Sequence, residues 1–160
     1  MLAVLHVQFR VHFQYISSNV EFVKQNGYFR SPISGRIRWF GWNPMPTEIA
    51  NFPVQACVSD VMNERLPRIW RHSRGEYSLY ERQQFLSGLS ITKKPTPIPG
   101  VKIIAQQHDA GIFECPEKQV DALKQRITEV WDEDVVLPSN GRRFKLPVDL
   151  KVATRLSDLG

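Results

Sequence analysis

The sequence predicts an α+β fold, and two patterns carry the prediction. Apolar residues recur at steps of three and four over 9–25, which is the spacing of one helical face. β-Branched and aromatic residues flank short polar turns over 27–40 and 101–115, a pattern typical of β-hairpins. Helices that alternate with such ribbons favour helices packed behind an antiparallel sheet.

The long middle helix is expected to begin at Pro46, which suits a first helical turn, and to end at about Trp70. Pro53 lacks a backbone N–H, so it predicts a kink or a fresh helix start. A short helix within 76–90 and a Pro-rich linker over 92–100 are expected to follow.

The last third of the chain begins with a helix that Pro116 opens and whose apolar stripe extends to Trp131. Two strands are then expected, over 135–137 and over 144–152, joined by a turn at 139–141.

Composition bounds the class of protein. A length of 160 residues, with 42% hydrophobic and 23% charged residues, is that of a one-domain globular chain. The net charge of +5 gives a mild preference for polyanions. Two cysteines without a Cys–His cluster argue against a zinc site or a disulfide framework and favour a reducing compartment. No apolar run reaches the roughly 18 residues of a membrane span, so a soluble intracellular chain is expected.

The hairpin of 101–115 lifts His108 and Asp109 to its turn. We expect buried strands on both sides to hold this tip rigidly. A carboxylate fixed in this way suits a magnesium ion, which prefers oxygen ligands. Asp is also a favoured turn residue in its own right, so a purely structural role for the pair is the alternative.

Two groups of basic residues are candidates for phosphate contacts. Arg30, Arg36 and Arg38 alternate with apolar residues, so we expect their guanidinium groups on one side of a ribbon. A solvated hairpin face has the same pattern. The second group either stabilises a helix end in solvent or binds phosphate. It consists of Arg65, Arg68, Arg71, His72 and Arg74.

Asn51 and Gln55 are four residues apart and therefore share a helical face. Two such amides can contact the acceptor groups that the DNA minor groove presents at every base pair. The alternative is that both amides cap backbone groups freed by Pro53.

Together these motifs resemble the C-terminal palm of family A DNA polymerases, in which a hairpin carries a His-Asp-Glu motif known as motif C. The resemblance covers most of the chain from the first helix onward, except for a longer connection or insertion over 67–100. The matching segments are Gln107-His108-Asp109, Ile112-Phe113-Glu114, Asn51-Phe52-Pro53-Val54-Gln55 with Asp60 after it, the turn at Gly35-Arg36, and the late stretch 146–151.

The resemblance implies a single partial domain over 1–160, with a palm-like antiparallel sheet that bears the motif C hairpin and is backed by helices. It implies catalytic roles for Asp109, as the second of two magnesium-binding aspartates, and for His108, near the primer terminus. The implied DNA contacts are Asn51, Gln55, Arg36, Arg38 and Thr47.

The chain departs from the family pattern at Thr47, Ala56 and Ala110, where the family usually has Arg, Gly and Glu. The family's first metal aspartate and its fingers helix precede the matching region and do not appear in the sequence. A lone carboxylate cannot organise two divalent cations about 4 Å apart, so the isolated chain is expected to be inactive.

The expected function is therefore that of the C-terminal palm part of a phage-type DNA-directed DNA polymerase, either a fragment or one part of a split enzyme. Its implied partners are primer–template DNA, a deoxynucleoside triphosphate, Mg²⁺ and an N-terminal segment with the first aspartate and the fingers. No membrane is implied, and the expected location is the cytoplasm of a bacterium or phage-infected host. A catalytically inactive duplex-binding module and a truncated reading frame stay open as alternatives.

Overall fold

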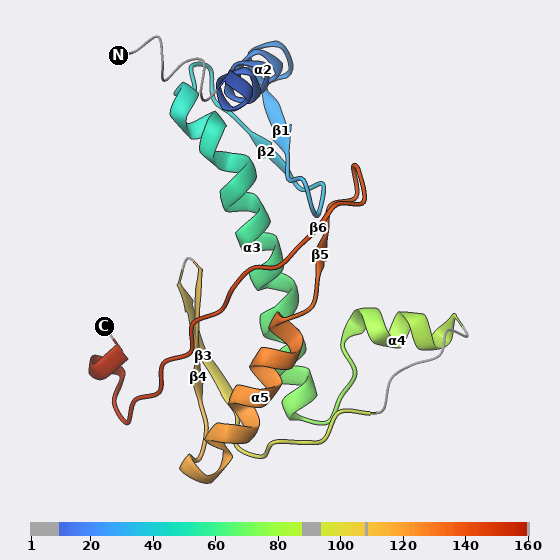
Figure 1. The fold of residues 1–160 in the computed structure, drawn as a ribbon, viewed down its shortest axis with the longest axis vertical. Coiled ribbons are helices and arrows are strands. Elements are labelled where there is room, and N and C mark those ends of the chain that lie inside the picture. Colours follow the sequence, from blue (N-terminus) through green and yellow to red (C-terminus); the bar gives the residue numbers. More distant parts are fainter. Residues whose placement is uncertain (1–9, 88–93, 108, 160) are drawn as a thin grey trace. The chain divides into compact units, whose positions relative to one another are not determined.

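A computed structural model describes residues 10–87, 94–107 and 109–159 (Figure 1). The chain divides into two compact units: the first comprises the chain up to Asp60 with Leu137–Gly141, and the second comprises Val61–Val136 with Arg142–Gly160. The elements are α2 (Arg10–Asn26), β1 (Tyr28–Arg30), β2 (Ile37–Trp39), α3 (Pro46–Ser73), α4 (Leu79–Leu86), β3 (Lys102–Gln107), β4 (Ala110–Glu114), the 3₁₀ helix η1 (Glu117–Gln119), α5 (Val120–Trp131), β5 (Val135–Val136), β6 (Arg143–Phe144) and the 3₁₀ helix η2 (Leu156–Leu159).

The predicted α+β class is confirmed, and every strand pair is antiparallel. The strands do not join one sheet, however. Over the described ranges they form three separate two-stranded ribbons, β1–β2, β3–β4 and β5–β6. Because a two-stranded ribbon alone is only marginally stable in water, each of them depends on packing against other parts of its unit.

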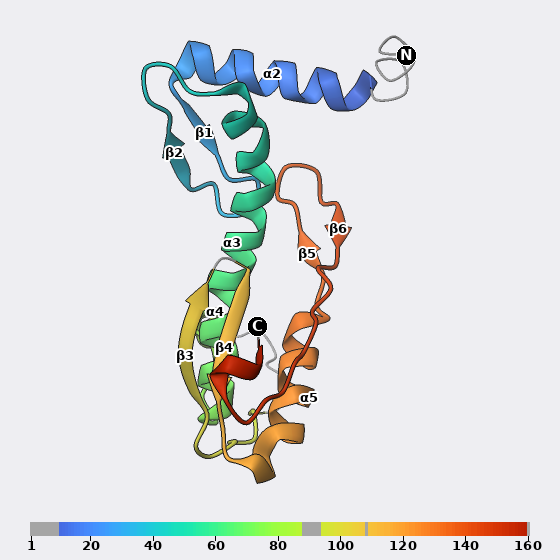
Figure 2. The ribbon, with the colours of Figure 1, turned by 90° about the vertical axis from the view of Figure 1, so that its left-hand side faces the viewer.

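The first unit starts with α2, which ends as predicted just before Gly27. The Gly27 N–H donates to the Val23 carbonyl at 2.7 Å, and its φ of 76° is the left-handed conformation of a helix C-cap. The β1–β2 ribbon follows and lies beside the first half of α3 (Figure 2). The Phe52 side chain of α3 lies edge-on to the rings of Phe29 and Phe40, with centroids 6.1 and 5.8 Å away.

The register of the ribbon corrects one expectation. Phe29 pairs with Arg38, and Arg30 pairs with Ile37. Because cross-strand partners share a face and neighbours along a strand do not, Arg30 lies on the face opposite to Arg38. The three arginines therefore do not form one row.

The middle helix α3 runs for 28 residues through both Pro53 and Pro67. Of the two outcomes expected at Pro53, a kink or a fresh helix start, the fresh start is therefore wrong. Pro53 removes one backbone hydrogen bond, but its ring is buried together with Ile49, Phe52 and Ala56. The free energy gained by burying these apolar side chains offsets the cost of a proline in a helix interior.

The second unit is organised around the C-terminal half of α3, which the β3–β4 ribbon and α5 flank (Figure 1). Gly111 of β4 lies so close to Leu66 that a Cβ added there would be 2.6 Å from Leu66 Cδ2. The buried apolar side chains of this unit are Val61, Met62, Leu66, Ile69, Ile98, Val101, Leu123, Ile127, Val130, Trp131 and Val135.

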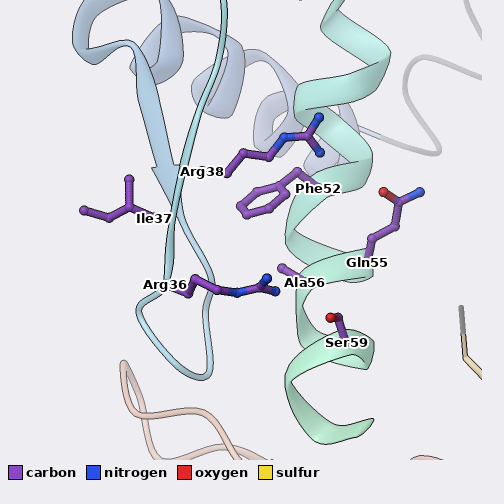
Figure 3. A pocket seen from close by; sticks show the side chains of 7 residues that line it. All are labelled: Arg36, Ile37, Arg38, Phe52, Gln55, Ala56 and Ser59. Carbon is purple, nitrogen blue, oxygen red and sulfur yellow. The ribbon is translucent and has the colours of Figure 1, made fainter. Parts of the chain in front are cut away.

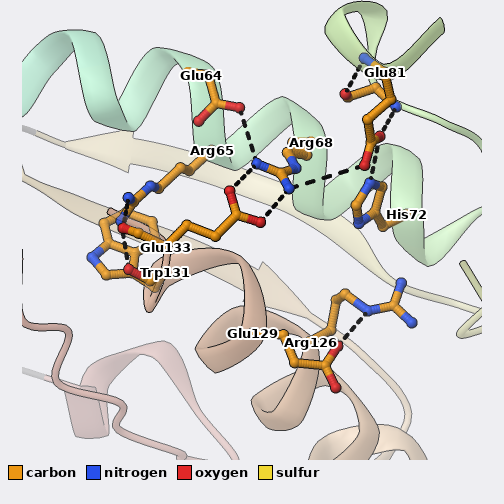
Figure 4. Close-up of polar contacts among 10 residues, drawn as sticks. Glu64, Arg65, Arg68, His72, Glu81, Arg126, Glu129, Trp131 and Glu133 are labelled. Atoms are coloured by element: carbon orange, nitrogen blue, oxygen red, sulfur yellow. Dashed lines mark hydrogen bonds and ion pairs between the residues drawn. The ribbon is translucent and has the colours of Figure 1, made fainter. Parts of the chain in front are cut away.

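The second basic group serves the fold of this unit. Arg65 is buried and donates to the carbonyls of Trp131 and Glu133, each at 2.6 Å, so it satisfies backbone acceptors at the end of α5. Arg68 pairs with Glu133 through both of its terminal nitrogens (Figure 4). Arg71 and Arg74 both lie within ion-pair distance of Glu76, at 3.6 and 3.0 Å. Each of these four arginines therefore has a partner within the unit, as the helix-end alternative expected.

The strand expected over 144–152 is also wrong. Only Arg143–Phe144 pairs, as β6 with β5, and 145–152 has no assigned strand. Among the described residues no neighbouring strand offers this stretch a backbone ladder, and Pro147 has no N–H to donate.

Gly75 closes α3 in a left-handed conformation, with φ 71°. An added Cβ would lie 2.7 Å from Pro97 Cγ, a rigid ring atom. At Gly27, φ is similar at 76°, but nothing lies within 4 Å of an added Cβ. We predict that Gly75→Ala and Gly27→Ala each cost about 1 kcal/mol of backbone strain, and that Gly75→Ala costs about 1–3 kcal/mol more. Urea unfolding of both variants checks this, and equal losses of stability would contradict it.

Candidate nucleic-acid interface

The first unit contains a hollow of about 340 Å³ between the β1–β2 ribbon and α3 (Figure 3). Its size suits a small charged group, not a whole duplex. Three residues expected to contact DNA, Arg36, Arg38 and Gln55, come together here from two elements. The full lining is Arg36, Ile37, Arg38, Phe52, Gln55, Ala56 and Ser59.

The two arginines reach the hollow because they are two residues apart on the ribbon and therefore point to the same face. Figure 3 shows both guanidinium groups directed toward α3, with the side chain of Ile37 pointing the other way. The Arg38 guanidinium lies 5.4 Å from the Phe52 ring centroid and 5.0 Å from that of Phe40. Cation–π contacts with these two rings thus hold the Arg38 guanidinium in place, and the same two rings pack against each other between ribbon and helix.

A row of polar side chains follows α3 along this side. Thr47, Asn51, Gln55 and Ser59 are each four residues apart, so successive members stand one turn above one another. Thr47, Asn51 and Gln55 are exposed, as a contact to another molecule requires. Asn51 and Thr47 lie outside the lining of the hollow.

Asp60 ties the turn of the ribbon to α3. Its Oδ2 accepts hydrogen bonds from the hydroxyls of Ser31 and Ser34, the latter at 2.7 Å, and from the Ser34 N–H at 3.3 Å. Its Oδ1 lies 3.1 Å from Arg36 Nη2. The side chain of Asp60 is only 6% exposed and that of Arg36 is 53% exposed, so one end of this ion pair is buried and the other faces solvent.

Burial by itself raises the pKa of the Asp60 carboxyl. The hydrogen bonds from Ser31 and Ser34 and the charge of Arg36 outweigh this effect, so the pKa lies below its usual value. Asp60 therefore stays ionised at neutral pH and keeps its hold on the turn.

Sequence reasoning did not find this network. The sequence indicates Asp60 only through the family resemblance, and Ser31 and Ser34 belong to the polar turn expected within 27–40. The partners are 29 and 26 residues away from Asp60 in sequence, so no local pattern links them. The spacing of four residues between Gln55 and Ser59 could have placed Ser59 on the same helical face from the sequence alone.

Pairing with carboxylates reduces the charge that the hollow offers. Arg36 is held by Asp60, and Arg38 pairs with Glu48 of the first turn of α3. A bound anion would therefore share each guanidinium group with a carboxylate.

Asp109 belongs to the second unit and lies at the turn of the β3–β4 ribbon, beside the pair Gln107↔Ala110. It is exposed, and most of β3 is exposed as well, so the expected buried strands on both sides of the tip are wrong. The other catalytic candidate, His108, lies outside the described residues.

Within the described ranges, no three or more His, Cys, Asp or Glu side chains gather where they could hold a metal ion. Asp109 offers a single carboxylate, and a pair of magnesium ions needs several oxygen ligands. These residues therefore do not make a magnesium site by themselves. Cys57 and Cys115 are both free thiols. No helix in the described part of the chain has the length and apolar character needed to span a membrane.

We predict that Asp60→Asn costs about 1–3 kcal/mol at neutral pH, because an amide has no charge to oppose Arg36 and one acceptor fewer. The native pKa is lowered, so this stabilisation is complete above about pH 4 and is lost as the pH falls through the native pKa. The stability difference between wild type and Asp60→Asn should therefore shrink in acid.

Urea unfolding between neutral pH and about pH 3 measures this difference. Asp121→Asn, at an exposed position of α5, is the matched control and should follow the wild type. A stability difference that stays constant across the pH range would contradict the assignment to Asp60.

No protein-family model matches this chain, and no match is found among curated proteins or solved structures. What the chain does must therefore be inferred from its own residues. The most informative are the arginines and the amide around the hollow, the buried carboxylate behind it, and the exposed Asp109.

Proposed function

We propose that this chain is the C-terminal palm portion of a family A DNA polymerase. Its first unit binds primer–template DNA, and its second unit contributes Asp109 to catalysis. Support comes from one observation above all. Arg36 and Arg38, expected to contact phosphate, and Gln55, expected to contact the minor groove, line a single hollow beside an exposed row of polar side chains.

The chemistry of this surface fits duplex DNA. Asn51 and Gln55 carry amides that can donate to minor-groove acceptors, which are present at every base pair. The half-exposed guanidinium of Arg36 retains donors for a phosphate oxygen after its contact with Asp60. Such contacts position a duplex without reading its sequence, as a template-directed enzyme requires.

Catalysis needs a second component. Asp109 alone is one carboxylate, and Ala110 beside it offers no ligand. The other aspartate, together with the fingers that hold the deoxynucleoside triphosphate, would come from an N-terminal segment of the same or a companion protein. Two Mg²⁺ ions bound between these segments would activate the primer hydroxyl and neutralise the phosphates.

A second candidate is a catalytically inactive module that only binds duplex DNA. The presence of Ala110 and the lack of a carboxylate group around Asp109 in the described residues favour it. The two candidates share the interface of the first unit and differ in what Asp109 does.

We predict salt-dependent binding of the full chain to a blunt DNA duplex. Arg36→Gln should reduce the slope of log K against log salt by about 0.9, which corresponds to one phosphate contact. Gln55→Ala should weaken binding by about 0.5–1.5 kcal/mol at every salt concentration, because it removes a neutral hydrogen bond. Fluorescence anisotropy over a salt series measures both effects.

The matched control for this binding test is Arg155→Gln, the same chemical change at an exposed position outside the hollow. If Arg36→Gln and Arg155→Gln change the salt slope equally, the attraction between DNA and the chain is diffuse and the proposed interface on the first unit is wrong. If the wild type does not bind duplex DNA, the proposed function fails.

Primer extension separates polymerase from binding module. The protein encoded directly upstream, if it supplies the missing aspartate and fingers, should extend a primed template with Mg²⁺ only when mixed with this chain. Asp109→Ala should abolish extension, whereas Asp121→Asn should leave it unchanged. Duplex binding without any extension would favour the inactive module.

A further inference from the structure

We propose that the first unit also binds unpaired nucleic acid, on the side of the β1–β2 ribbon turned away from α3. This surface, the outer ribbon face, consists of Tyr28, Arg30, Ile37 and Trp39. A base stacks on Trp39, and Arg30 holds a neighbouring phosphate. The proposed duplex contacts use the opposite face of the same ribbon, so the outer ribbon face is a separate site.

The strand register defines this face. Tyr28 pairs with Trp39, and Arg30 pairs with Ile37, so all four side chains point to one side. The intervening pair, Phe29 with Arg38, points to α3, where Phe29 meets Phe52. Figure 3 shows the same division, because Ile37 points away from the helix that Arg38 faces.

The outer ribbon face is apolar and open. Trp39 is 71% exposed and Ile37 is 38% exposed. The rings of Tyr28 and Trp39 meet edge to face, with centroids 5.3 Å apart and an interplanar angle of 62°. Tyr28 thus supports Trp39 from one side without covering it, and an exposed indole face can accept a stacked base.

Arg30 supplies a positive charge that no acidic side chain balances. Among the described residues it forms no ion pair; its guanidinium donates to the Gly35 carbonyl at 3.3 Å and lies 5.6 Å from the Tyr28 centroid. In the described part of the first unit the acidic residues are Glu21, Glu48 and Asp60. Glu48 and Asp60 hold Arg38 and Arg36, and Glu21 accepts from Gln25.

An open indole beside an unbalanced cation fits a nucleotide better than an apolar protein surface. A nucleotide brings a flat ring and an anionic phosphate, so it satisfies both groups at once. An apolar protein patch would cover Trp39 but would bury Arg30 without a partner, which costs free energy. The face is small, so it suits one or two bases of a strand that leaves a duplex.

The test is binding of the full chain to a fluorescein-labelled oligothymidylate of about ten nucleotides, followed by anisotropy. Trp39→Ala should weaken binding about tenfold or more, since it removes the indole on which a base stacks. Arg30→Gln should reduce the slope of log K against log salt by about 0.7, the value for one contact on a single strand.

Two controls match these substitutions. Trp42→Ala removes an even more exposed indole, at 105%, from the loop that follows the ribbon and should leave affinity unchanged. Arg155→Gln should leave the salt slope unchanged. Both Trp39→Ala and Arg30→Gln should bind blunt duplex like the wild type, which separates this site from the proposed duplex interface.

Three outcomes would overturn the inference. The wild type does not bind the oligonucleotide; Trp39→Ala and Trp42→Ala weaken binding equally; or Trp39→Ala instead abolishes concentration-dependent association of the chain with itself, as measured by sedimentation. The last result would make the outer ribbon face a protein contact. Loss of duplex binding alone would affect the proposed function and not this site.

Discussion

The first unit depends on one buried carboxylate. A two-stranded ribbon with three-residue strands has little stability of its own, and the aromatic contacts of Phe52 are made with Phe29 and Phe40, outside the turn. Asp60 joins the turn to α3, because one oxygen holds Ser31 and Ser34 and the other holds Arg36. Removing the Asp60 charge would affect both the fold of the unit and the hollow, since the same carboxylate holds the turn and Arg36.

The distribution of acidic residues decides what each arginine can do. A net charge of +5 suggests a generally basic protein, yet many of its guanidinium groups are already engaged. Arg65 satisfies backbone carbonyls, Arg68 is held by Glu133, and Arg36 and Arg38 each have a carboxylate. Arg30 differs from these. Counting charges along the sequence therefore overstates how much of this protein is available to a polyanion at close range.

The sequence predicted those features that local chemistry determines. The end of α2 at Gly27, both hairpins and the shared side of Arg36 and Arg38 follow from spacing and turn residues, whereas the meeting of these arginines with Gln55 depends on how the ribbon packs against α3. Features that depend on distant partners were missed, such as the carbonyls 66 and 68 residues away that Arg65 binds. Where local and tertiary preferences conflict, the tertiary one prevails: Pro53 stays helical because it is buried. The strand expected over 144–152 failed for the converse reason, since a strand exists only with a neighbour.

The division of the sheet into ribbons has a consequence for handling the protein. Every strand in the described part of the chain belongs to a pair, so each has one side on which backbone N–H and C=O groups lack a strand neighbour. Such open edges can template the addition of a strand from another molecule. Strands of two or three residues offer little backbone for such an addition, so at high concentration β3 and β4, with six and five residues, are the strands to which another molecule would add.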